Sequence, residues 1–84
     1  MTKSVPRLIR RKEVLELYPV SVSTLYARMD SGLFPPSISI GPRSVCWVES
    51  EVHAVVRAMI HSPSPDELKT LVMESVKSRS DQWL

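Results

Sequence analysis

The chain is poor in the residues that build disulfide-linked, β-rich or metal-dependent proteins. It has a single cysteine, Cys46, which excludes an internal disulfide and fits a reducing cytoplasm. Only 2 glycines and 6 % aromatic residues occur among its 84 residues, which favours helices over a β-sandwich or barrel. No Cys/His cluster has zinc-finger spacing, so we expect neither a metal nor a cofactor. The composition predicts one small, mainly helical domain.

Long apolar runs are also missing. No stretch approaches the roughly 18 apolar residues that cross a bilayer, and the N-terminus lacks the apolar segment of a signal peptide. We therefore expect a cytoplasmic protein that is neither secreted nor membrane-spanning. A chain this short has no room for a deep substrate cleft, and Cys46 and His53 lack a third group to orient them as nucleophile and base. We expect no enzymatic activity.

Charge of opposite sign gathers in the two halves of the chain. Residues 1–47 contain seven Lys or Arg against three Asp or Glu, whereas residues 48–84 contain four against six. This segregation predicts one surface that faces phosphate and another that faces away from it. Ordinary scatter of solvated charges is the alternative.

Two short helices are predicted close together in the basic half. The first lies within residues 10–18. The cations Arg10, Arg11 and Lys12 precede it, and Pro19 ends it. The second begins at a Ser21 cap and ends at a left-handed Gly32. Because only two residues separate them, the helices form a helix-turn-helix pattern.

The second helix has two different faces. The packed face is predicted to carry Val22, Leu25 and Met29, and the outer face carries small or basic side chains, Ser23, Thr24, Ala27 and Arg28. Small side chains allow close approach to phosphates and base edges in a major groove. Val22 could instead touch a thymine methyl group, although packing inward is the simpler interpretation.

A β-hairpin should follow the helix pair. Strands are predicted over residues 37–40, where Ile38 and Ile40 alternate with serines, and over residues 45–48. The Gly-Pro-Arg-Ser loop between them places Arg43 at the tip, as in the wing of a winged helix-turn-helix. We expect Trp47 to lie in the core rather than to stack on nucleic acid bases.

Two further helices are predicted in the acidic half. Ser50 should cap a helix through Ile60, and a Ser64/Glu67 capping box should start another that runs from Pro65 to about residue 79. The last helix has an apolar face that consists of Leu68, Leu71, Val72 and Val76. This face either mediates self-association or covers the core of its own chain. The predicted division is a flexible arm at 1–7, a winged helix-turn-helix at 8–61, and a linker with a helix at 62–84.

Several segments together resemble the AlpA family of prophage regulators. They are Ile9-Arg10-Arg11-Lys12-Glu13-Val14, Val20-Ser21-Val22-Ser23-Thr24-Leu25-Tyr26, Gly32-Leu33-Phe34-Pro35-Pro36, and Gly41-Pro42-Arg43-Ser44-Val45 with Trp47 and Glu51-Val52. The resemblance covers residues 8–60. It implies a winged helix-turn-helix of the MerR and excisionase type, encoded by a phage or bacterium and associated with the nucleoid. It also implies transcriptional control or excision of integrated DNA, with integrase or RNA polymerase as partners.

These patterns together select candidate residues for double-stranded DNA. They are Ser23, Thr24, Ala27 and Arg28 on the second helix, Arg43 and Ser44 in the wing, and Arg10, Arg11 and Lys12 before the first helix. Solvated surface cations are the alternative for the basic residues. Family members often place a basic or polar residue where this chain has Val22. The alternative function is a protein-interaction module that uses the C-terminal helix and has little affinity for DNA.

Overall fold

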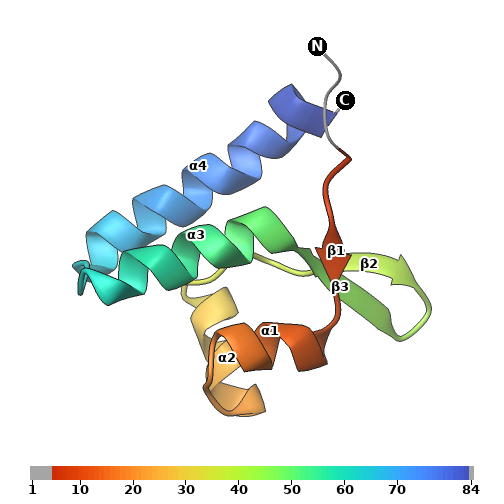
Figure 1. The fold of residues 1–84 in the computed structure, drawn as a ribbon, viewed down its shortest axis with the longest axis horizontal. Helices are drawn as coiled ribbons and strands as arrows, with labels where there is room; N and C mark the ends of the chain where they lie inside the picture. Colours follow the sequence, from red (N-terminus) through yellow and green to blue (C-terminus); the bar gives the residue numbers. More distant parts are fainter. Residues whose placement is uncertain (1–4, 84) are drawn as a thin grey trace.

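The computed structural model describes residues 5–83, and their side chains as far as Arg79. Four helices and a small antiparallel sheet form the fold, which agrees with the predicted winged helix-turn-helix and its additional C-terminal helix (Figure 1). The elements in chain order are β1 Leu8–Ile9, α1 Arg11–Leu17, α2 Val22–Asp30, β2 Ile38–Gly41, β3 Ser44–Val48, α3 Glu49–Ile60 and α4 Pro65–Trp83.

The sheet has three strands in the order β1-β3-β2. Sequence patterns predict β2 and β3 but miss β1, which contains only two residues and pairs Ile9 with the distant Trp47. The segment before β1 is also held in place, because the Arg7 carbonyl accepts a 2.8 Å hydrogen bond from the backbone N–H of Glu49. Of the predicted arm, residues 1–4 lie outside the described residues, and the flexibility of the rest stays a prediction.

A β-bulge shapes the wing. Ser39 pairs with Val45, but the next pair joins Gly41 to Ser44, so Ile40 is an extra residue on β2. Ile40 is consequently exposed, so the two isoleucines that alternate with serines in the sequence do not share one face of a regular strand. The bulge brings the chain to a tight Pro42–Arg43 tip (Figure 1).

The core lies where the sheet meets the helices. Trp47 is fully buried, as predicted, and Leu25 and Phe34 are buried with it. The Tyr18 and Phe34 rings pack with their centroids 4.8 Å apart, which ties the end of α1 to the segment between α2 and β2. The helix-turn-helix is therefore fixed against the wing by large apolar side chains.

The start of two helices differs from the prediction. α1 begins at Arg11, so Arg11 and Lys12 occupy its first turn instead of preceding it. α3 begins at Glu49, and its N-cap is Val48 rather than Ser50. β3 continues directly into α3, and the Arg7 carbonyl provides a partner for one of the amides at the start of the helix, the Glu49 N–H.

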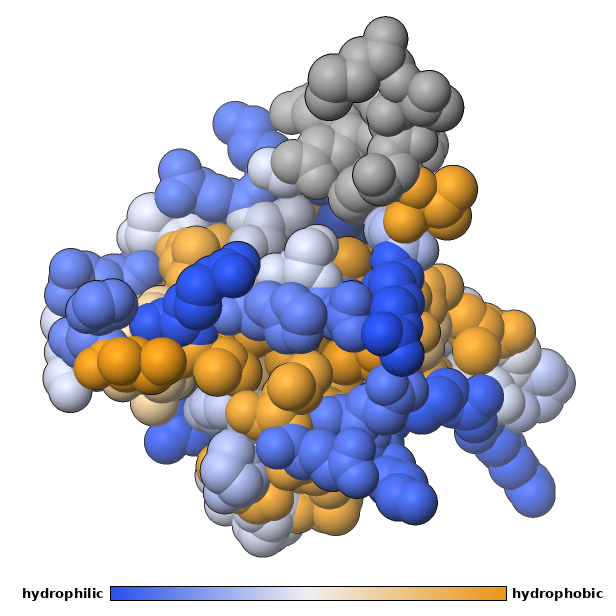
Figure 2. Space-filling model, in the orientation of Figure 1, coloured by the Kyte–Doolittle hydropathy of each residue, from blue (hydrophilic) through white to orange (hydrophobic). Residues whose placement is uncertain are grey.

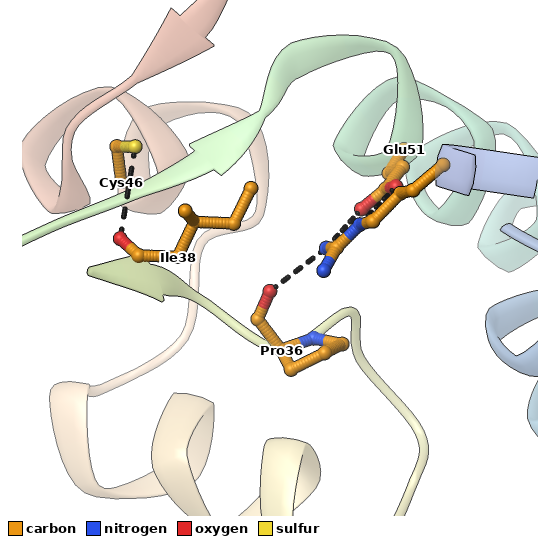
Figure 3. A network of polar contacts seen from close by, with 5 residues as sticks. Pro36, Ile38, Cys46 and Glu51 are labelled. Carbon is orange, nitrogen blue, oxygen red and sulfur yellow. Dashed lines mark hydrogen bonds and ion pairs between the residues drawn. The ribbon is translucent and has the colours of Figure 1, made fainter. Parts of the chain in front are cut away.

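α4 lies along α3 on the side away from α1 and α2 (Figure 1). The predicted capping box is present: the Ser64 N–H donates to Glu67 Oε1 at 2.9 Å, and the Glu67 N–H donates to Ser64 Oγ at 3.2 Å. Leu68 and Val72 are buried in the core of the same chain. The helix extends to Trp83, about one turn beyond the prediction, and Arg79 anchors it to Glu51 and to the Pro36 carbonyl (Figure 3).

Candidate nucleic-acid interface

A cleft of about 500 Å³ lies between the start of α1, the start of α2 and the wing. We call it the basic cleft. It is lined by Arg10, Arg11, Lys12, Leu15, Val22, Arg43 and Val45. Four of these seven residues are cations that the sequence selects as candidates, and they come from two segments about 30 residues apart. The fold therefore gathers positive charge around the first residue of α2.

The cations at the start of α1 are exposed. Arg10 is the N-cap of α1 with an extended backbone and no side-chain capping bond, and Arg11 and Lys12 follow in the first turn. Among the ion pairs of the described residues, none involves these three side chains. Cations near a helix N-terminus meet the positive end of the helix dipole, so they do little for the stability of α1. They are free to meet an anion.

The first turn of α2 is organised by Ser21. Its Oγ accepts a 3.1 Å hydrogen bond from the Thr24 N–H, which confirms the predicted cap, and lies 2.9 Å from Thr24 Oγ1. The Thr24 hydroxyl is thereby held in the cap and half-buried, whereas Ser23 stays exposed. Of the two hydroxyls predicted to meet DNA, Ser23 is the more accessible.

The buried face of α2 is centred on Leu25, with Arg28 and Met29 half-buried beside it. Val22 is 42 % exposed, so the prediction that it packs inward with Leu25 is wrong. The helix is rotated about its axis relative to the prediction, and its outward face carries Val22, Ser23, Tyr26, Ala27 and Asp30.

Arg28 does not line the basic cleft. It lies instead in a second groove of about 360 Å³, together with Leu17, Tyr18, Pro19, Val20, Val56, Met59 and Ile60. Its Nε is buried and has no hydrogen-bond partner among the described residues. We call this the Arg28 groove. The structure thus separates Arg28 from the other candidate cations.

The wing tip places Arg43 in the basic cleft with an unusual backbone. Its φ of 59° is left-handed, a conformation that side chains with a Cβ adopt at a cost. The Arg43 side chain is exposed, and Ser44 is half-buried at the start of β3. Strained residues of this kind occur preferentially at functional sites.

The sequence profile of the family described as "Prophage CP4-57 regulatory protein (AlpA)" matches residues 7–57. The chain belongs to the AlpA family. The matched segment contains all residues of the basic cleft and ends before α4.

A curated relative is the "Uncharacterized protein ORF88" of Enterobacteria phage P4. It is 44 % identical over 48 residues, which cover 57 % of this chain and 54 % of the relative. The chain therefore spans about half the length of this relative. The family description is that of a prophage regulator, and the relative is a phage protein.

Tyr26 is a surface residue of the AlpA-family segment that the sequence candidates omit. It is 37 % exposed and lies one turn after Val22 on the outward face of α2. Val22 and Tyr26 are four residues apart, so their spacing places them on one face of the helix. Only the packing of Leu25 shows that this face points outward.

Cys46 lies in a buried environment that does not favour reactivity. The thiol is buried, and its Sγ donates to the Ile38 carbonyl at 3.7 Å (Figure 3). Within residues 5–83, no helix is long and apolar enough to cross a membrane.

Proposed function

We propose that this protein is a sequence-specific, double-stranded DNA-binding regulator. Its α2 helix enters the major groove, and its wing contacts the adjacent backbone or minor groove. The observation that carries the proposal is the basic cleft, in which Arg10, Arg11, Lys12 and Arg43 surround the exposed first turn of α2. Membership of a family of phage regulators supports it.

The four cations have the arrangement that phosphate binding requires. They are long, exposed side chains on two sides of a helix start, so they can reach phosphates on both sides of a groove. On the outward face of α2, the exposed side chains of Ser23 and Ala27 are small, which suits close approach to base edges. Thr24 and Ser44 are half-buried, and the Thr24 hydroxyl is engaged with Ser21 in the cap of α2.

The biological role that we propose is control of prophage or genomic-island DNA in the bacterial cytoplasm. The family description supports transcriptional regulation. An excisionase role uses the same binding mode, because both require a small protein that recognises short duplex sites. Integrase or RNA polymerase would then be the protein partner.

A competition experiment tests sequence-specific binding. The full chain is bound to a duplex from the region upstream of its own gene and challenged with a scrambled duplex of equal composition. We expect the scrambled duplex to compete poorly, and Ser23→Ala to reduce the difference between the two. The control is Ser75→Ala, a helical serine on α4 outside the cleft. Equal competition by both duplexes would contradict sequence specificity.

A protein contact is the second candidate function, and the Arg28 groove favours it. Exposed apolar side chains, including Ile60 at 75 % exposure, line this groove beside an arginine with an unpartnered buried Nε. Figure 2 shows an apolar band across the face in view, below α4. The groove suits an apolar segment that also carries a carboxylate.

The Arg28 groove replaces the apolar stripe of α4 as the candidate protein surface. Leu68 and Val72 of that stripe are buried within the chain. Met73, on the outer side of α4, is 71 % exposed, so self-association through α4 stays a proposal.

Heparin chromatography separates the two candidate functions. A DNA-binding protein is retained and elutes with salt, whereas a protein that only binds other proteins flows through.

A further inference from the structure

An apolar side chain stands exposed among the cations of the basic cleft. Val22 is 42 % exposed, and the other apolar lining residues, Leu15 and Val45, are half-buried. The cleft therefore has an apolar floor and a basic rim. A rim of cations alone would bind any phosphate backbone, but the exposed floor adds a surface that prefers an apolar contact.

Local structure fixes the position of this valine. The Ser21 cap makes Val22 the first residue of α2, and the burial of Leu25 turns Val22 outward. The side chain is β-branched and has few rotamers, so it presents its two methyl groups in a defined direction. N-terminal residues of a recognition helix are the ones that reach base edges in the major groove.

The side chain of valine cannot donate or accept a hydrogen bond. In the major groove, the one apolar group that distinguishes a base is the 5-methyl of thymine. We propose that Val22 is a specificity-determining residue that recognises a thymine methyl group at the base step facing the start of α2. This inference rests on the proposed DNA-binding function. It adds the identity of one preferred base and the residue that selects it.

Deoxyuridine provides a sharp test, because it keeps the hydrogen-bonding edge of thymine and removes only the methyl. A duplex is first selected by the full chain from a random library, and each thymine is then replaced singly by deoxyuridine. We expect one position in each binding site at which wild-type Kd rises about threefold to fourfold, the effect of losing one buried methyl. The same replacement should leave the Kd of Val22→Ala unchanged.

A purely structural role for Val22 gives a different result. If Val22 only completes the floor with Leu15 and Val45, Val22→Ala weakens binding to the thymine and deoxyuridine duplexes by the same factor. That outcome, or wild-type binding that ignores every deoxyuridine, would overturn the inference and leave DNA binding intact. If Val22→Ala still binds the thymine duplex more tightly than the deoxyuridine duplex, another residue contacts the methyl, and the inference is overturned as well.

Two controls keep the test interpretable. Tyr26→Ala changes the neighbouring outward position one turn away, and its discrimination at the thymine read by Val22 should match that of the wild type. Val22→Thr retains one methyl on a β-branched side chain, and should discriminate more than Val22→Ala does. Absence of any selected duplex at low salt would contradict the proposed function itself.

Discussion

Arg79 of α4 holds both carboxylate oxygens of Glu51 on α3. Its Nε donates to Glu51 Oε2 at 2.7 Å and its Nη2 to Oε1 at 2.6 Å, and Nη2 also reaches the Pro36 carbonyl at 3.0 Å (Figure 3). The side-chain hydrogen bonds to Glu51 raise the pKa of Arg79, and Glu51 is only 6 % exposed. A residue outside the family-matched segment thus neutralises the one buried carboxylate of the described core and ties α4 to the chain entering the wing.

Removing Arg79 should destabilise the fold strongly. Arg79→Ala leaves Glu51 charged, buried and without its partner, so we expect a loss of about 2 to 4 kcal/mol in the free energy of unfolding. Urea denaturation measures it. In the double variant with Glu51→Gln, the second substitution should recover part of the loss, because an amide has no charge to desolvate. A loss under about 1 kcal/mol, typical of an exposed ion pair, would contradict this role.

Arg43→Gly should separate stability from binding. Glycine adopts the left-handed backbone at φ 59° without a Cβ clash, so we expect the free energy of unfolding to rise by up to about 1 kcal/mol. The same change removes a cation from the basic cleft and should weaken DNA binding. Arg43→Ala is the matched control, since it loses the charge but keeps the strained Cβ. If Arg43→Gly binds DNA with wild-type affinity, the wing is not part of the interface.

The Ser21 cap should contribute measurably to stability. Ser21→Ala removes the acceptor for the Thr24 N–H and releases the Thr24 hydroxyl, which should cost about 1 kcal/mol in the free energy of unfolding. Ser21→Asp keeps an acceptor and should restore most of it. Thermal unfolding of the three proteins gives the comparison, and equal stability of Ser21→Ala and wild type would refute the cap.

Glu67 should make stability depend on pH in the acid range. The Ser64 backbone N–H, followed by the Ser64 hydroxyl, lowers the pKa of Glu67. A lowered folded-state pKa means that this stabilisation is fully present above the ordinary glutamate pKa and is lost as pH falls through the folded value. The unfolding midpoint should therefore decrease less steeply with falling pH in Glu67→Gln than in wild type. Glu74→Gln, another exposed glutamate of α4, is the control and should follow the wild type more closely.

Local signals predicted the four helices and the side-chain caps of two of them, α2 and α4. Ser21 and the Ser64/Glu67 box each act within three residues, so their hydrogen bonds can be inferred from spacing alone. What the sequence could not show depends on distant partners. β1 exists because Ile9 meets Trp47, and the Arg79–Glu51 pair joins residues 28 apart.

The candidate site was predictable in its cations but not in its helix orientation. Arg10, Arg11, Lys12 and Arg43 come together as charge and the wing pattern indicate. Arg28 lies in another groove and Val22 is exposed, contrary to the prediction, because the rotation of α2 is set by how Leu25 packs against the core. Helical spacing defines which residues share a face, and only tertiary packing decides which face is buried.

The salt dependence of duplex binding tests the central claim most directly. Wild-type affinity is measured over a series of salt concentrations, beside Arg43→Ala and beside Lys77→Ala, which removes an exposed cation of α4. Each lost phosphate contact reduces the slope of log K against log salt by about 0.9. We predict that Arg43→Ala loses affinity and about that much slope, whereas Lys77→Ala matches the wild type. Binding without salt dependence, or identical slopes in all three proteins, would contradict a DNA interface at the basic cleft.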